Sequence, residues 1–126
     1  MIQILAIAAG GATGAVLRHF FNIGVLALTG ATFPLGILVI NVLGSLVMGL
    51  LAGFFAHVHE PSQTLKVFLT VGVLGGFTTF SAFSLDAVLL WERGEILQSL
   101  AYVLCSVVFS IAALTAGLFL VRVLSA

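Results

Sequence analysis

The chain has 126 residues, of which 62% are hydrophobic and only 6% are charged, and its formal net charge at neutral pH is zero. This composition lies far outside the range of soluble domains and indicates an integral membrane protein. The zero net charge gives no reason to expect a nucleic-acid partner, and the single cysteine excludes an intrachain disulfide.

Four apolar segments follow one another along the chain, each near the roughly 20 residues that a helix needs to cross a bilayer. We expect transmembrane helices at about 2–21, 35–56, 65–91 and 96–120. The connectors between them are short and leave no room for a soluble domain. The sequence therefore predicts an all-α integral membrane protein, a single four-helix transmembrane domain over residues 1–126.

The first two spans each carry a polar side chain. Arg18 is a cation inside the first span, where it either reaches for the membrane surface or lines a vestibule and concentrates anions. Asn41 lies deep in the second span, and such an asparagine either joins helices or donates along a pathway.

The third span contains a stretch rich in glycine and hydroxyl side chains, residues 75–84, where a membrane helix would normally be most apolar. Non-helical backbone at that depth is tolerated only where it is buried in protein or lines a wet cavity. We therefore expect the third helix to be broken at 75–80, in mid-membrane. Freed carbonyl groups in broken helices of transport proteins turn toward ions.

Two aromatic residues and a carboxylate follow this break. Phe80 and Phe83 are one helical turn apart, and their positive ring edges would attract an anion, although packing alone would also explain them. Asp86 shares the face of Thr79 and Phe83. It is either a pathway carboxylate or a cap near the headgroups.

The fourth span carries three hydroxyl side chains spaced four residues apart on one helix face: Tyr102, Ser106 and Ser110. Beside Asn41 they would form a hydrated track. The alternative is an ordinary helix-packing seam.

The four Lys and Arg residues divide evenly between the two sides of such a bundle, with Lys66 and Arg122 opposite Arg18 and Arg93. The positive-inside rule then gives no preferred orientation. Insertion in both directions would permit an antiparallel homodimer, whereas weaker cues would set one orientation. Stripes of small residues offer close helix contacts: Gly10 and Gly14; Ser45, Gly49 and Gly53; Ala113 and Gly117.

Over essentially its whole length the chain resembles the small bacterial fluoride channels of the Fluc family. The resemblance rests on several motifs: Gly10-Gly11-x-x-Gly14 with Arg18, Pro34-x-Gly36 with Asn41, Gly75-Gly76-Phe77-Thr78-Thr79-Phe80-Ser81-x-Phe83-Ser84, and Tyr102 with Ser106 and Ser110. Two positions depart from the family pattern: Ile37 replaces a usual threonine, and Asp86 replaces a usual glutamate. We expect both departures to affect the rate of conduction more than the assignment of the chain to this family.

The resemblance implies an antiparallel, dual-topology homodimer in the bacterial inner membrane, with two fluoride pathways at its interface. Phe80 and Phe83 would present ring edges to fluoride, and Asn41 would donate from its amide. Backbone carbonyls of Gly75 and Thr78 from both subunits would hold a structural sodium ion. The polar track would be completed by Thr79, Tyr102, Ser106 and Ser110, with Arg18 in the vestibule.

The expected function is passive fluoride export, which reduces fluoride toxicity. No nucleophile–base–orienter set is visible, so an enzyme is not expected. One alternative is a proton-coupled antiporter of the small multidrug-resistance type, but it needs a carboxylate deep in the first helix, which this sequence lacks. A non-transporting assembly subunit would explain the glycine stripes but not the polar break.

Overall fold

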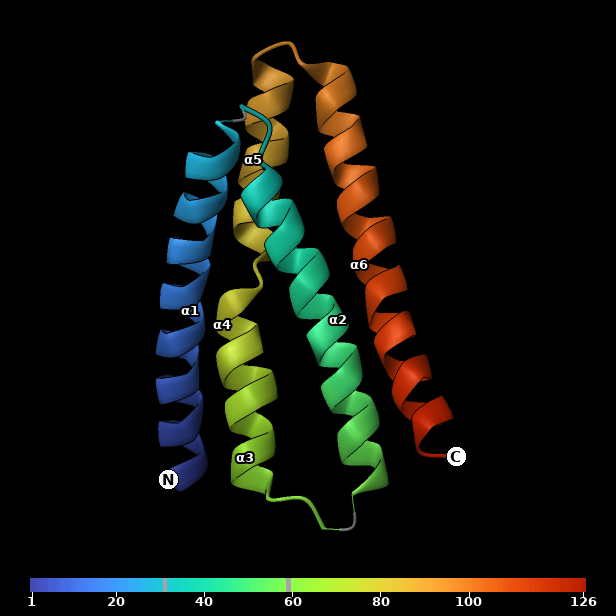
Figure 1. The fold of residues 1–126 in the computed structure, drawn as a ribbon. Helices are drawn as coiled ribbons and strands as arrows, with labels where there is room; N and C mark the ends of the chain where they lie inside the picture. Colours follow the sequence, from blue (N-terminus) through green and yellow to red (C-terminus); the bar gives the residue numbers. More distant parts are fainter. Residues whose placement is uncertain (31, 59) are drawn as a thin grey trace.

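The structure is a computed structural model that describes residues 1–30, 32–58 and 60–126, and it consists of helices joined by short loops. The helices, in chain order, are α1 (Ile2–Thr29), α2 (Leu35–His57), α3 (Gln63–Val67), the π-helical η1 (Phe68–Leu74), α4 (Gly75–Phe77), α5 (Phe80–Glu92) and α6 (Ile96–Leu124). Segments α3 to α5 together form the third of four spans that are long and apolar enough to cross a membrane. The prediction of four spans is confirmed. Both termini lie at the same end of the bundle (Figure 1).

The first helix is longer than predicted. We expected it to end near Phe21, but α1 continues to Thr29. Asn22 does not interrupt it, because apolar residues resume at once and the first strong stop signal is Gly30. Gly30 adopts the left-handed conformation (φ 59°) and donates its N–H to the Leu26 carbonyl. The limits of the other three spans differ from the prediction by at most about one helical turn.

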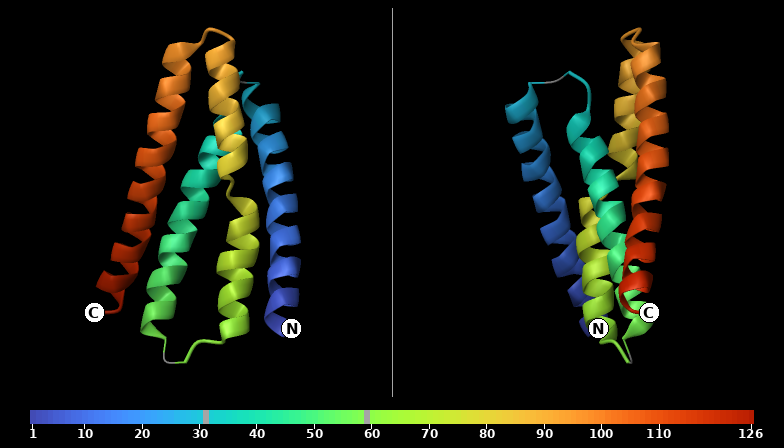
Figure 2. Two further views of the ribbon diagram at one scale, coloured as in Figure 1. Left: turned by 180° about the vertical axis from the view of Figure 1, so that it is seen from behind. Right: turned by 45° about the vertical axis from the view of Figure 1, so that its right-hand side comes forward.

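The helices pack as two close pairs, α1 along η1 and α4, and α2 along α6 (Figures 1 and 2). Glycines allow both contacts. A Cβ at Gly10 would lie 2.6 Å from the Phe68 carbonyl oxygen, and a Cβ at Gly117 would lie 2.6 Å from that of Leu46. A Cβ at Gly49 would overlap the Leu114 carbonyl oxygen. The glycines of these stripes are therefore used for packing within one chain.

Among the described residues, the largest fully buried side chains lie where α5 and α6 meet the start of α2. Tyr102, Ile40 and Leu90 have almost no exposed surface there, and Phe83 and Ile37 complete the cluster. Many large apolar side chains elsewhere are exposed. Such a surface would aggregate in water but suits the hydrocarbon of a bilayer.

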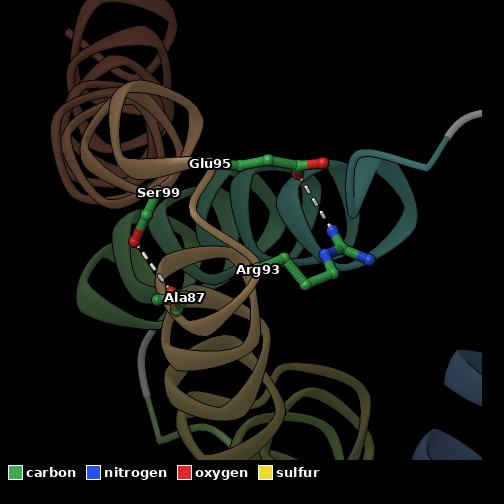
Figure 3. Close-up of polar contacts among 4 residues, drawn as sticks. All are labelled: Ala87, Arg93, Glu95 and Ser99. Carbon is green, nitrogen blue, oxygen red and sulfur yellow. Dashed lines mark hydrogen bonds and ion pairs between the residues drawn. The ribbon is translucent and has the colours of Figure 1, made fainter.

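A tight turn joins α5 to α6. Gly94 has a left-handed backbone (φ 81°), and the exposed side chains of Arg93 and Glu95 form an ion pair of 3.2 Å across it. One turn into α6, the Ser99 hydroxyl donates to the Ala87 carbonyl at 2.7 Å (Figure 3). The first half of α6 is thereby attached to α5, while its second half packs on α2.

Candidate functional site

The helical backbone of the third span is interrupted at Thr78 and Thr79, which both have extended conformations (ψ 158° and 125°). The interruption is shorter than the predicted 75–80, because Gly75–Phe77 is still helical and α5 begins at Phe80. The new helix starts at once because Thr79 caps it: its hydroxyl accepts the Ala82 N–H at 3.1 Å.

The interruption removes the usual helical partners of the carbonyl groups of residues 75–78, among them Gly75 and Thr78. In a continuous α-helix the Thr79 N–H would bind the Gly75 carbonyl, but here it donates to Asn41 Oδ1 at 2.8 Å. The Ala82 N–H would likewise bind the Thr78 carbonyl, but it donates to the Thr79 hydroxyl. Of these four carbonyls, the resemblance associates those of Gly75 and Thr78 with sodium.

Arg18 lies beside the interruption. Its Nη1 donates to the Thr78 carbonyl at 3.1 Å and thereby joins α1 to the extended segment. The side chain is partly buried and turns inward to this contact, so it is not simply extended toward the membrane surface. A guanidinium is a strong donor, so this contact helps to orient the Thr78 carbonyl.

Asn41 is joined to Thr79 at both ends of its amide. Besides accepting the Thr79 N–H, it donates from Nδ2 to the Thr79 carbonyl at 2.9 Å. The side chain therefore links α2 to the interrupted span. Because an amide nitrogen carries two hydrogens, one N–H remains for another acceptor.

A groove of about 400 Å³ runs beside the interruption and is open on one side. We use "the groove" for this space between α2, α5 and α6. The structure brings most of the predicted site residues to its wall: Asn41, Thr78, Thr79, Phe80, Phe83, Ser106 and Ser110. Gly75, Arg18, Asp86 and Tyr102 are not in its lining.

Two hydroxyl groups in the wall have no protein partner. The Oγ atoms of Ser106 and Ser110 are buried and make no hydrogen bond within the described part of the chain, and Ser106 is only 5% exposed. A packing seam would normally satisfy its hydroxyls, because leaving a buried polar group unpaired is costly. The arrangement therefore suits an acceptor or water molecules within the groove.

The two phenylalanines differ in exposure. Phe83 is 8% exposed and Phe80 is 77% exposed, and their ring centroids are 5.4 Å apart with an interplanar angle of 54°. Phe83 is held from behind by Tyr102, whose ring centroid is 5.3 Å away. Phe80 has no such support and projects from the chain beside the groove.

Tyr102 and Asp86 form a polar pair behind Phe83. The Tyr102 hydroxyl donates to Asp86 Oδ2 at 3.3 Å, so the aspartate does reach this tyrosine although it is shorter than a glutamate. Ile37 is buried in the same cluster as Tyr102 and adds no hydroxyl there. Asp86 lies within α5 and is only partly exposed, so it does not cap the end of the helix.

Sequence reasoning missed two contacts of this region. It did not assign Thr78 as the partner of Arg18, because the two residues are 60 positions apart. It also overlooked Ser99, which lies three residues before Tyr102 and so extends the same face of α6. The spacing alone could have pointed to Ser99.

Comparison with known proteins gives one consistent result. Residues 5–118 match the model of the family described as CrcB-like protein, Camphor Resistance. A protein of Rhodospirillum centenum named fluoride-specific ion channel FluC is 52% identical over 97% of both chains. FluC 1 of Nitrobacter hamburgensis is 52% identical over 96% of both chains, and FluC of Rhizobium meliloti is 49% identical over 97% of this chain and 98% of its own.

Proposed function

Because the chain belongs to the CrcB-like family, we propose that it is a fluoride-selective channel that lets fluoride leave the cytoplasm down its gradient. Its relatives are named as channels, so the protein is not classed as an enzyme. It is a multi-pass membrane protein, and we place it in the bacterial inner membrane, where passive export would reduce fluoride toxicity.

One observation carries the proposal: the groove combines unpartnered hydroxyls with an amide donor and an aromatic wall. Ser106 and Ser110 have no hydrogen-bond partner among the described residues, and Asn41 retains one N–H. Fluoride is small and strongly hydrated, so a pathway must replace its water with such donors. The ring edges of Phe80 and Phe83 add weak positive potential.

The groove contains no fixed charge in its lining. A lysine or arginine there would bind the anion too tightly for rapid passage, because conduction needs binding that is weak enough to reverse. Neutral hydrogen-bond donors attract the anion without binding it too tightly to leave. Narrowness and donor geometry would then separate fluoride from the larger chloride ion.

We further propose that two copies assemble as an antiparallel homodimer with dual topology. The even division of the four Lys and Arg residues supports it, since it leaves the chain without an orientation preference. The open side of the groove and the projecting Phe80 also support it. A second copy packed there would enclose the groove and cover the ring.

A structural sodium ion at the centre of this dimer is part of the proposal. The resemblance assigns backbone oxygens as its ligands. The Gly75 and Thr78 carbonyls lack their usual helical partners, and hard cations prefer oxygen ligands. The Thr78 oxygen accepts from Arg18 and keeps a second lone pair for an ion. The ion would stabilise the dimer and would not permeate.

The decisive experiment is ion efflux from liposomes that contain the purified protein, followed with a fluoride and a chloride electrode. We expect rapid fluoride efflux without chloride efflux, and loss of the fluoride signal in Phe80→Ile. Phe119→Ile is the matched control, because Phe119 is also exposed but lies outside the groove. Well-folded protein that releases no fluoride would refute the channel and direct attention to Asp86 and proton-coupled antiport.

A further inference from the structure

Two side-chain hydrogen bonds join α5 to α6 within the described residues. The Ser99 hydroxyl donates to the Ala87 carbonyl at 2.7 Å, and the Tyr102 hydroxyl donates to Asp86 Oδ2 at 3.3 Å. Both donors belong to α6, and both acceptors are neighbours on α5. The bond from Ser99 is the shorter, and its acceptor is the backbone itself.

The Ser99 bond is one of the contacts that hold α6 on α5. Ser99 is 5% exposed and lies one helical turn before Tyr102, on the same face. The Ala87 carbonyl is part of the α5 backbone, so the bond ties the start of α6 directly to that backbone (Figure 3). Tyr102 is carried with it.

The ion pair at the turn is a weaker constraint than the Ser99 bond. The Arg93–Glu95 ion pair is exposed to solvent on both sides, and such pairs contribute little to stability. Further along, α6 is held against α2 at Gly117 and Gly49. The hydroxyl side chains of the groove lie between these two attachments, so Ser99 controls the end of α6 that carries Tyr102.

Tyr102 connects the position of α6 to the groove, because its ring contacts Phe83. Its ring lies against Phe83 at 5.3 Å between centroids and is itself held by Phe33 at 5.6 Å. Phe83 lines the groove, whereas Ser99 and Tyr102 do not. A rotation or shift of α6 would therefore displace Ser106 directly and Phe83 through Tyr102. The geometry of the groove would change although none of its lining residues is substituted.

We infer that Ser99 is a positioning residue for conduction, which keeps Tyr102 against Phe83 and so maintains the geometry of the groove. The inference rests on the proposed fluoride channel for its functional consequence. Its structural part, the dependence of Tyr102 on Ser99, stands separately and can be measured in a protein that conducts nothing.

The test uses Ser99→Ala and Ser99→Thr in the full-length protein, with Thr115→Val as the matched control. Thr115 is also on α6, but its hydroxyl bonds within its own helix, to the Ile111 carbonyl, and is exposed. We expect Ser99→Ala to lower fluoride efflux roughly tenfold, as for loss of one buried hydrogen bond. Ser99→Thr should retain efflux, and Thr115→Val should leave it unchanged.

A spectroscopic signal separates positioning from general destabilisation. Tyr102 is the only tyrosine of the chain, so protein labelled with 3-fluorotyrosine gives one ¹⁹F resonance from this ring. We expect that resonance to shift in Ser99→Ala and to stay near its original position in Ser99→Thr and Thr115→Val. A shift in protein that releases no fluoride would support the positioning role and refute only the channel.

Two results would overturn the inference. One is a Ser99→Ala protein with unchanged resonance and unchanged efflux. The other is reduced efflux with an unmoved resonance, which would mean that Ser99 acts without Tyr102. Should Ser99→Ala fail to fold, Ser99→Cys keeps the volume with a much weaker donor, and the same resonance and efflux criteria apply to it.

Discussion

Asn41 and Thr79 are joined by two hydrogen bonds, one from the asparagine amide to the Thr79 carbonyl (2.9 Å) and one from the Thr79 N–H to the asparagine oxygen (2.8 Å). The side chain of α2 thus takes the place of a neighbouring peptide group. It pairs the Thr79 N–H, which has no helical partner, and gives the Thr79 carbonyl a second donor besides the first bond of α5. An unpaired peptide group at membrane depth would be costly.

Replacing Asn41 tests this relationship. Asn41→Ala leaves the N–H of Thr79 unpaired, at roughly 1–3 kcal/mol, and removes one of the two donors to the Thr79 carbonyl, which also accepts the first bond of α5. We expect fluoride efflux to fall by more than about tenfold and thermal stability in detergent to decrease. Asn22→Ala, which removes an asparagine that does not line the groove, serves as the control. Efflux of Asn41→Ala equal to that of the control would contradict the assignment.

Arg18 could act in two ways: by orienting the Thr78 carbonyl through a hydrogen bond, or by attracting anions through its charge alone. Its guanidinium donates to the Thr78 carbonyl at 3.1 Å. Lysine keeps the charge but not the planar donor geometry. If the contact matters, Arg18→Lys lowers both fluoride efflux and the melting temperature. If Arg18 only concentrates anions in a vestibule, efflux through Arg18→Lys will match the original protein, and only an uncharged variant will lose it.

Sodium removal tests the proposed structural ion. Preparing the protein in N-methyl-D-glucamine instead of sodium should abolish fluoride efflux and shift the dimer toward monomer on size exclusion. Returning sodium should restore both, whereas the larger potassium ion should restore less. Full activity after exhaustive removal of sodium would exclude an ion held by the Gly75 and Thr78 carbonyls.

The glycine contacts predict a clear difference between two neighbouring positions. A Cβ at Gly14 would overlap the Val73 carbonyl oxygen, whereas one at Gly11 would meet nothing within 4 Å. We expect Gly14→Ala to destabilise the protein by about 1–3 kcal/mol, as overpacking does. Gly11→Ala should be neutral or slightly stabilising, because alanine favours the helix. Thermal unfolding in detergent measures both, and equal melting temperatures would contradict the packing.

Local patterns in the sequence were sufficient for much of this protein. Hydropathy alone predicted four spans, because the length and apolar character of a membrane helix are properties of a continuous segment. The motif around Phe80 and Phe83 led to the resemblance to the Fluc family, which the family match and the relatives confirm. The regular spacing of Ser106 and Ser110 placed them on one face, and the structure finds both in the groove.

Only the tertiary structure decided which groups meet across the bundle. The limits of the interrupted segment depend on Asn41, which lies 38 residues away, and the Thr78 carbonyl is bound by Arg18 from another helix. The glycine stripes suited either an intrachain or an intersubunit contact until their neighbours were known. Local sequence patterns cannot predict such pairings. A polar group buried among helices bonds to the partner that packing brings near, at any distance along the chain.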